Sequence, residues 1–358
     1  MTIQLNTSAV DLAAVEEFAA KVGGDRAAAY NAVLVYLGDR LGLWQALASV
    51  DSATSAQLAE RSGLAERYVR EWLSAQAAAG YLTYDPETTS FSLPAEHAMV
   101  LADEDSPFSV AGVYGIIAAV WASADQLAHA YVTGEGVAWH DHDPRLFTGV
   151  ERFFRTQYRH QLVDAWLPTV DGLVDRLTAG IRVVDVGCGL GASTILMAEA
   201  FPASTFVGVD YHEESIRGAV AAAEAAGVSD RVRFETGDAQ SYEGAYDLVC
   251  FFDALHDLGD PIGALEHAHS VLAEEGEVFT VEPFAEDTLE ANLASPMGLT
   301  YFCASSCLCV PHSMSEDGLA LGAQAGPTKL KAAFTQAGFT TARIASSTPY
   351  NLVIEAHA

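Results

Sequence analysis

The chain has 358 residues, half of them hydrophobic, and a formal net charge of -30 at pH 7. This length and composition suit a globular protein of two or three domains. The strong negative charge repels nucleic acid and anionic lipid, which weighs against a function on DNA or at a membrane surface.

The cysteines and the N-terminus indicate a reducing compartment. An odd number of cysteines in or beside predicted core segments suits reduced thiols better than a disulfide framework. The first residues lack the basic opening and apolar stretch of a signal peptide, and no apolar run approaches the length of a bilayer span. We therefore expect a cytoplasmic protein. The five cysteines are Cys188, Cys250, Cys303, Cys307 and Cys309.

Residues 1–105 are predicted to form a helical domain that ends in a winged helix. Apolar residues recur at helical spacing in AVEEFAAKVG and in AAAYNAVLVYLGDRLGLWQAL, which predicts two helices, the second capped by Asp25. Residues 54–94 then contain two short helices and two β-like runs around the turn DPETT. This order of helix, turn, helix and hairpin is typical of a winged helix.

Residues 106–180 are predicted to be a helical connector and lid, and residues 181–358 an α/β domain. From Arg182 onward, short valine-rich runs alternate with alanine-rich helical segments, which is typical of a parallel sheet covered by helices. The last two runs, TTARIASS and NLVIEAHA, are joined by a short turn, so we expect a hairpin at the end of the sheet.

The stretch VVDVGCGLGAST predicts a strand, a glycine turn and the start of a helix. Gly187, Gly189 and Gly191 allow a ligand to approach the backbone closely at the carboxyl end of the strand, where open α/β sheets bind cofactors. A relaxed dinucleotide fingerprint also fits this stretch, so a nicotinamide or flavin enzyme is one alternative.

Three aspartates lie in or at the ends of three successive predicted strands. Asp185 lies inside the first strand, where a carboxylate suits a cationic group better than an anionic pyrophosphate. Asp210 ends the second strand, where it can accept both hydroxyls of a ribose. Asp238 ends the third, where it can accept an adenine amino group. S-adenosylmethionine (SAM) carries an ammonium and a sulfonium, so the three carboxylates together favour SAM over a dinucleotide.

On these motifs, the region from about residue 180 to the end resembles the class I SAM-dependent methyltransferases. With the winged helix in front, the chain resembles more narrowly an actinobacterial group of methyltransferase-like proteins, some of which are labelled transcriptional regulators. The resemblance implies a Rossmann-like, seven-stranded domain with an antiparallel last strand. The motifs that carry it are VVDVGCGLG, FVGVDYHEESI, GDA, YDLVCFFDALHDLGDP, LAEEGEVFTVEP, LALGAQAG and TPYNLVIEA.

The same resemblance implies further contacts with SAM. In similar enzymes the helix before the first strand covers the cofactor, which makes Tyr158 a candidate lid residue. Tyr211 and Ala239 follow two of the aspartates, and Phe252 ends the fourth predicted strand. We expect these four residues to line the cofactor site.

His256 is the candidate general base, since imidazole titrates near neutral pH and this residue follows the fourth predicted strand closely. O-methyltransferases with an N-terminal winged helix carry their base in a similar pair, which His256 and Asp257 resemble. Glu282, at the end of the fifth predicted strand, is the expected partner that orients His256, and Asp253 is the alternative partner. A solvated loop histidine is the structural alternative.

The sequence therefore predicts a dimeric, SAM-dependent methyltransferase of a small, apolar or aromatic acceptor, with O-methylation favoured. The main alternative is a SAM-binding regulator without catalysis. Residues 1–100 hold 6 lysines and arginines against 12 aspartates and glutamates, which argues against DNA and favours dimerisation as the role of the winged helix. The segment CASSCLCVPH, which ends at His312, lacks the familiar zinc-site spacing, so no metal is expected.

Overall fold

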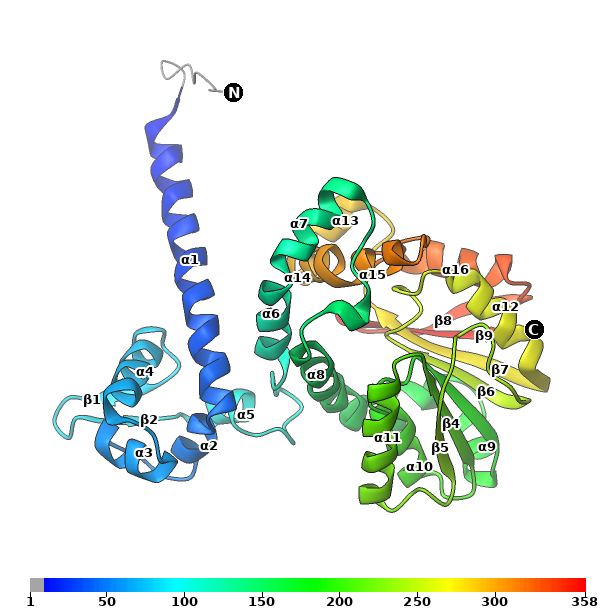
Figure 1. The fold of residues 1–358 in the computed structure, drawn as a ribbon, viewed down its shortest axis with the longest axis horizontal. Coiled ribbons are helices and arrows are strands. Elements are labelled where there is room, and N and C mark those ends of the chain that lie inside the picture. Colours follow the sequence, from blue (N-terminus) through cyan, green and yellow to red (C-terminus); the bar gives the residue numbers. More distant parts are fainter. Residues whose placement is uncertain (1–9) are drawn as a thin grey trace. The chain divides into compact units, whose positions relative to one another are not determined.

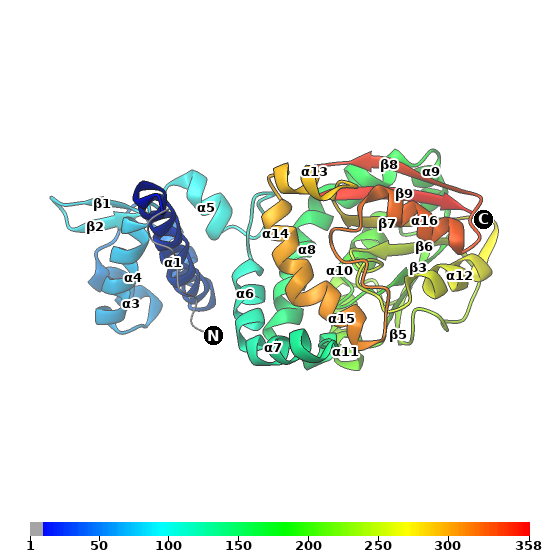
Figure 2. The same ribbon diagram turned by 90° about the horizontal axis from the view of Figure 1, so that it is seen from above.

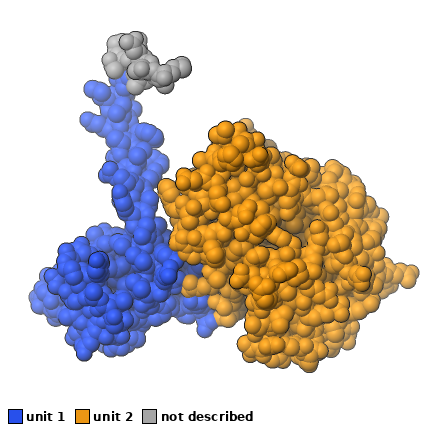
Figure 3. Space-filling model, in the orientation of Figure 1, with its two compact units in different colours: residues 1–114 blue, residues 115–358 orange. Residues whose placement is uncertain are grey.

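The computed structural model of the chain describes residues 10–358, which divide into two compact units. The first unit ends at Tyr114 and the second begins at Gly115 (Figure 3). Residues 115–180, most of the expected connector, are therefore counted with the second unit.

The first unit is a helical domain with a two-stranded wing. Thr54 caps α3 through a capping box with Gln57, as the sequence spacing predicts. Trp44 and Trp72 pack edge to face in its apolar core, with ring centroids 4.6 Å apart. Helices α3 and α4 with the β1–β2 hairpin confirm the winged helix. The elements are α1 (Leu12–Arg40), α2 (Leu43–Ala48), α3 (Ser55–Ser62), α4 (Glu66–Ala78), β1 (Thr83–Asp85), β2 (Ser90–Ser92) and α5 (Ala95–Leu101).

The N-terminal segment forms one long helix, so the two helices predicted from its apolar pattern are wrong. Asp25, predicted as an N-cap, lies inside α1 and pairs with Lys21 at 2.7 Å. Gly23 and Gly24 weaken a helix intrinsically. Nothing lies within 4 Å of where their Cβ atoms would be, so no neighbouring group forces a break there. In Figure 1 the N-terminal half of α1 extends well beyond the other helices of its unit.

The second unit is built on a seven-stranded sheet in the order β5-β4-β3-β6-β7-β9-β8. The first five of these strands pair in parallel, and β9 is antiparallel to both β7 and β8. This confirms the predicted sheet and its terminal hairpin. The strands are β3 (Arg182–Val186), β4 (Thr205–Asp210), β5 (Val232–Thr236), β6 (Tyr246–Phe252), β7 (Leu272–Pro283), β8 (Thr341–Ser347) and β9 (Asn351–His357).

Two apolar cores cover the two faces of this sheet. Val184 and Phe251 belong to the core that includes α12 and α16, whereas Val183 and Cys250 belong to the core that includes α8 to α11. The assignment alternates because successive side chains of a strand point to opposite faces. Figures 1 and 2 show the sheet between these helical layers. The helices are α8 (Arg145–Gln161), α9 (Leu173–Ala179), α10 (Ala192–Ala200), α11 (Glu213–Ala226), α12 (Pro261–Val271) and α16 (Gly326–Gln336).

The cap, made of residues 115–149 and 289–325, joins two distant parts of the chain. Its apolar centre contains Ala119 of α6, Leu146 of α8, and Leu308. The cap is tied to the loop after β6, because the N–H of Gly322 donates to the carbonyl of His256 at 2.9 Å. The helices of the cap besides α8 are α6 (Val113–Ala122), α7 (Ala124–Thr133), α13 (Leu289–Ala294), α14 (Gly298–Ala304) and α15 (Val310–Ser315).

Candidate functional site

The glycine turn lies between β3 and α10, at the point where the strand order reverses. Gly187, Gly189 and Gly191 have φ angles of 75°, 53° and 81°, a region that favours glycine. Gly191 is also sterically required, because a Cβ there would lie 2.5 Å from the ring of Phe234. The turn therefore brings the start of α10 to the carboxyl edge of the sheet, where ligands of open α/β folds bind.

Asp185 is a buried carboxylate with one oxygen to spare. Its Oδ2 accepts hydrogen bonds from Ser193 Oγ and Thr194 Oγ1, both at 2.6 Å. Its Oδ1 is buried and has no hydrogen-bond partner. Burial raises the pKa of Asp185 to about 6, although both hydroxyls oppose the shift. An unpaired, desolvated carboxylate oxygen is suited to a cationic donor.

Asp210 lies at the end of β4 and holds the neighbouring loops. Its Oδ2 accepts from the backbone N–H of Gly189 and its Oδ1 from that of His212, each at 2.9 Å. Burial raises the pKa of Asp210, and these two hydrogen bonds oppose the shift. Tyr211, the next residue, is 42% exposed and stacks on His312, with ring centroids 6.1 Å apart.

Asp238 and Ala239 follow β5 at the outer edge of the sheet. Asp238 is exposed, and its Oδ1 accepts from the N–H of Gln240 at 2.8 Å. In the β4–β5 pairing Asp210 lies opposite Thr236, two residues before Asp238. The three aspartates predicted from the sequence thus lie along three adjacent strands in the order β3, β4, β5.

His256 and Glu282 form a buried pair after β6 and at the end of β7. His256 Nδ1 lies 2.7 Å from Glu282 Oε2, and the two residues are 4% and 0% exposed. Glu282 also accepts from the backbone N–H of Leu255 at 3.0 Å and of His256 at 3.2 Å. In the neutral imidazole we assign the proton to Nδ1 because it faces a carboxylate, which leaves Nε2 as the acceptor.

The pKa of His256 is raised by its surroundings. Burial acts to lower it, but the charge of Glu282 and a hydrogen bond with Cys309 outweigh that effect. The site therefore favours the imidazolium form, which is the form a general base reaches after it takes a proton.

Asp253, the alternative partner, bonds to other groups. Its Oδ2 accepts from Tyr158 Oη at 3.3 Å and its Oδ1 from Asn351 Nδ2 at 3.4 Å. Asp257 is partly buried next to the base, and burial raises its pKa against the opposing charges of His256 and His312. Between the two candidate partners, the structure pairs Glu282 with His256.

Tyr158 covers the end of β6 from α8. Its hydroxyl also donates to the carbonyl of Phe252 at 3.4 Å, and its ring is 6% exposed. Phe154 stacks on it at 5.8 Å, and Trp166 meets it edge to face. The predicted lid helix thus lies against the strand that precedes the candidate base.

Several residues of the site carry no signal in the sequence. Ser193 and Thr194 bind Asp185, yet hydroxyl residues at the start of a helix are common. His312 Nδ1 accepts from the N–H of Trp139 at 3.2 Å, across 173 residues of chain. The cap segment CASSCLCVPH was noticed in the sequence for its cysteines, but the contact of its His312 with Trp139 was not predictable.

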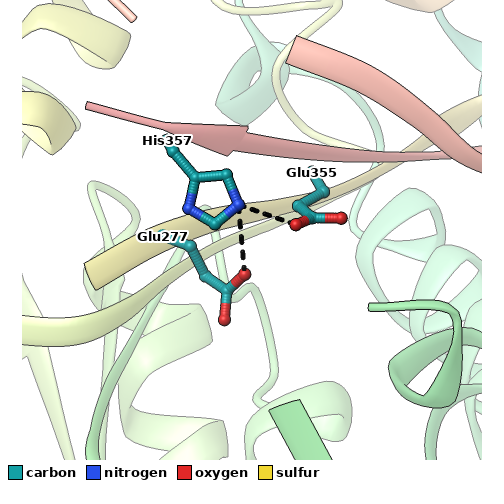
Figure 4. Close-up of side chains that lie close together, drawn as sticks. All are labelled: Glu277, Glu355 and His357. Carbon is teal, nitrogen blue, oxygen red and sulfur yellow. Dashed lines mark hydrogen bonds and ion pairs between the residues drawn. The ribbon is translucent and has the colours of Figure 1, made fainter. Parts of the chain in front are cut away.

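Outside this site, three ionisable residues converge at the other end of β7 and β9. Within residues 10–358, Glu277, Glu355 and His357 are the one group of three whose potential metal-ligand atoms all lie within 4.8 Å of one another (Figure 4). Arg176 pairs with Glu277 at 2.5 Å, and Arg343 pairs with Glu355. These arginines balance both carboxylates, so the group is an ion-pair network that holds the C-terminal strand.

Family models match two regions of the chain. Residues 29–103 match the Rv2258c-like winged HTH domain, and residues 177–333 match a methyltransferase domain. Three curated relatives share 31 to 38% identity over 79 to 103 residues, and the chain spans only 24 to 38% of their lengths. O-demethylpuromycin-O-methyltransferase of Streptomyces alboniger is 26% identical over 338 residues, which covers 85% of this chain and 84% of that protein.

Solved structures share the architecture of the whole chain. Mitomycin 7-O-methyltransferase MmcR has a TM-score of 0.69 at 19% identity, over 97% of this chain and 100% of that one. Human N-acetylserotonin methyltransferase, solved in complex with SAM, has a TM-score of 0.64 at 17% identity, over 95% of this chain and 97% of that one. At these identities the likeness establishes the fold.

Proposed function

We propose that this chain, in which a winged helix–turn–helix domain precedes a class I methyltransferase domain, is a SAM-dependent methyltransferase of a small molecule. The observation that carries the proposal is the buried His256–Glu282 pair, held at 2.7 Å at the carboxyl edge of β6 and β7. O-methylation is favoured, because a hydroxyl acceptor must lose a proton and His256 is positioned to take it.

The residues along β3, β4 and β5 suit SAM as the cofactor. Asp185 would hold the ammonium group through its unpaired Oδ1, and Asp210 would accept from the ribose hydroxyls. Asp238 and Ala239 would contact the adenine, and Tyr211, Tyr158 and Phe252 would supply apolar contacts. The cofactor supplies an activated methyl group when it is bound. A structure of the same fold that holds SAM supports this assignment.

The proton transfer depends on Glu282. In the neutral imidazole, this carboxylate holds the proton on Nδ1, so that Nε2 is the atom that would accept the proton of an acceptor hydroxyl. The imidazolium that results is stabilised by the same carboxylate. The buried setting excludes water, which strengthens this interaction.

The cap favours a small acceptor with an apolar or aromatic body. Trp139, Phe147 and Tyr301 pack with Leu308 and Cys309 in its apolar cluster, close to the loop that carries the base. Sites for small molecules are mostly apolar with a few polar groups. The proteins named above include O-demethylpuromycin-O-methyltransferase and Mitomycin 7-O-methyltransferase MmcR, which is in keeping with such an acceptor.

We further propose that the chain acts as a homodimer in the cytoplasm. Apolar residues on α1 are strongly exposed, among them Leu12 at 72%, Phe18 at 66% and Val33 at 56%, and a second copy would bury such a stripe. Among residues 10–358, no helix is long and apolar enough to cross a membrane. The five cysteines are free thiols, which suits a reducing compartment.

A SAM-binding regulator is the second candidate, because a winged helix–turn–helix model matches residues 29–103. The exposed arginines of α4 are already paired on their own helix, Arg67 with Glu71 at 2.5 Å and Arg70 with Glu66 at 2.7 Å. A reader of DNA needs a basic face, so this helix is poorly suited to the task. Tight, salt-resistant and sequence-specific binding in a mobility-shift screen would favour the regulator.

The test of the proposed reaction is the variant His256→Ala. With an acceptor found by screening hydroxylated aromatic molecules, turnover should fall by roughly a hundredfold or more, the usual contribution of a general base. SAM affinity measured by calorimetry should stay within about threefold, since His256 is not assigned to the cofactor. His269→Ala, a histidine of α12, serves as the control. Wild-type turnover in His256→Ala would remove His256 from the mechanism.

A further inference from the structure

Asp253 is an acidic residue of the site that the proposed proton transfer does not use. It follows β6 with a φ angle of 51°, a conformation that costs a non-glycine residue on the order of 1 kcal/mol or more. Its N–H donates to the carbonyl of Val281 at 2.7 Å, which holds the backbone in this state. The strained turn fixes the direction in which the carboxylate leaves the strand.

One oxygen of the Asp253 carboxylate, Oδ1, is directed toward β9, whereas the other accepts from Tyr158 of the lid helix α8. Oδ1 bonds to Asn351 at the start of β9, and β9 lies on the far side of β7 from β6. Asp185 and Asp210 lie on β3 and β4, in the opposite direction along the sheet. A group bound to Asp253 on the β9 side therefore belongs to the acceptor.

The hydrogen bonds of Asp253 are weak for a carboxylate. Both donors, the Tyr158 hydroxyl and the Asn351 amide, are neutral. Their distances of 3.3 and 3.4 Å to the carboxylate exceed the roughly 2.7 to 2.9 Å that is usual for charge-assisted hydrogen bonds. The carboxylate can accept a stronger donor without losing an existing strong bond.

The local charge also favours a cationic partner. Burial and the charge of Glu282 raise the pKa of Asp253, while His256 and Tyr158 lower it only in part. The carboxyls of Glu282 and Asp257 both raise the pKa of Asp253, and His256 is the imidazole whose charge opposes them. A cation placed here would stabilise the ionised form of Asp253.

Aromatic side chains flank this carboxylate. Tyr158 touches it directly, and Phe154 stacks on Tyr158. Burial first, and then the charge of Asp253, raise the pKa of Tyr301, which places the Tyr301 hydroxyl in the same region. Aromatic rings around a carboxylate are suited to an ammonium group, because the ring faces attract cations.

We propose that Asp253 binds an ammonium group of the methyl acceptor, so that the substrate is a hydroxylated molecule that also carries a basic amine. Asn351 and Tyr158 position the carboxylate, and His256 receives the hydroxyl proton of the same acceptor. The inference rests on the proposed function, since it assigns the acceptor of the same site.

The experiment measures binding to the full-length protein saturated with S-adenosylhomocysteine. The probes are a panel of aromatic hydroxyamines, each paired with its N-acetylated counterpart, which has the same aromatic body without the charge. Calorimetry should show at least one amine that binds tenfold or more tightly than its N-acetyl form. Equal affinity within every pair, or no binding by any amine of the panel, would overturn the proposal.

Variants then assign the preference to Asp253. In Asp253→Asn the amine and its N-acetyl form should bind within about threefold of each other, whereas Asp230→Asn, at an exposed aspartate outside the site, should keep the preference. Asp253→Gly, which accepts the positive φ without strain, gives the same readout if the asparagine variant does not fold. A preference that survives in both Asp253 variants would contradict the assignment.

S-adenosylhomocysteine affinity separates the two sides of the site. It should change by less than about threefold in Asp253→Asn, because the carboxylate is assigned to the acceptor. A loss of more than tenfold would place Asp253 at the ammonium group of the cofactor and overturn the proposal. If the amine preference is intact but no amine is methylated, the proposed function fails while the amine site stands.

Discussion

Glu282 accepts three hydrogen bonds from the loop after β6, one from the imidazole of His256 and two from backbone N–H groups. One side chain thus sets the position, the tautomer and the charge of the candidate base. A carboxylate with 0% exposure needs such partners, because an unpaired buried charge is costly.

The pH dependence of the reaction should follow the ionisation of His256 in its pair with Glu282. The pKa of His256 is raised, so the neutral imidazole that can accept a proton becomes abundant only above the usual histidine range. We expect kcat/KM to rise with pH and to reach half its maximum above about pH 6.5, the ordinary pKa of histidine. Values of kcat/KM measured from about pH 5 to 10 would show this rise.

Glu282→Gln should move this rise in rate to lower pH, because the largest of the charges that raise the pKa of His256 is then removed while burial still lowers it. Turnover should also fall at least tenfold, since the imidazolium loses its stabilising partner. The control is Glu290→Gln, at an exposed glutamate of α13. If kcat/KM reaches half its maximum at the same pH in Glu282→Gln as in wild type, a group other than His256 titrates.

Asp210→Ala should weaken SAM binding by roughly tenfold to a hundredfold, because charge-assisted hydrogen bonds contribute about 1.5 to 3 kcal/mol. The same change also frees the N–H of Gly189 and so loosens the glycine turn. Calorimetry with SAM measures the affinity, and Asp230→Ala, at an exposed aspartate between α11 and β5, is the control. Unchanged affinity would contradict the ribose assignment.

The order of the strands explains why these single residues could be predicted together. Parallel strands end at the same edge of a sheet, so residues placed just after strands converge even when they are far apart in the chain. This reasoning placed Asp210, Asp238, His256 and Glu282 at one edge of the sheet and Asp185 within the strand beside them, as the strand order has them. Ser193, Thr194 and Asn351 were not found in this way, because their roles depend on which carboxylate lies opposite them.

β7 and β9 pair from Glu277 to Pro283, and at the end away from Glu282 they carry the ion-pair network of Glu277, Glu355 and His357 (Figure 4). Glu277 is 2% exposed and is balanced chiefly by Arg176, which comes from α9 and also donates to the carbonyl of Asp247 at 3.0 Å. The network therefore attaches α9 to the centre of the sheet.

Arg176→Gln should destabilise the protein by about 2 to 3 kcal/mol, because Glu277 is then buried without its main counterion. Urea unfolding gives the free energy. Arg217→Gln breaks an exposed pair with Glu213 on α11 and should cost less than about 0.5 kcal/mol. The double variant Arg176→Gln with Glu277→Gln should recover part of the loss, and a loss that does not recover would contradict the ion-pair explanation.

The long helix α1 was the element that the sequence pattern described least well. Its glycine pair and the aspartate after it are typical helix boundaries, yet they lie inside a continuous helix. Each residue that favours a helix end contributes only about 1 kcal/mol. The free energy gained by continuing a long helix cooperatively outweighs that preference here.

The chain as a whole carries a net charge of -30, and yet its first unit exposes an apolar helix. Like charges keep copies of the protein apart unless a specific apolar contact outweighs the repulsion. The exposed apolar residues of α1 recur every three or four positions, which is the spacing of one helix face. The four that define this face are Leu12, Val15, Phe18 and Val22.

Phe18→Glu should convert the expected dimer into a monomer, because it places a charge in the centre of that apolar face. Sedimentation at micromolar concentration measures the mass. Val132→Glu, at a valine of α7 that is 85% exposed, is the control and should leave the mass unchanged. If wild type already sediments as a monomer, α1 has another partner.

The amino-acid sequence by itself determined the winged helix, the seven-stranded sheet, the glycine turn and the strand-end aspartates with His256 and Glu282. These features follow from local backbone preferences, from the period of apolar residues, and from the rule that parallel strands end together. Only the tertiary structure decided the contacts between segments that approach each other through packing: Asp253 with Asn351, His312 with Trp139, and Cys309 with His256. Such contacts depend on how the cap and the terminal hairpin pack against the sheet, and no local backbone preference specifies that packing.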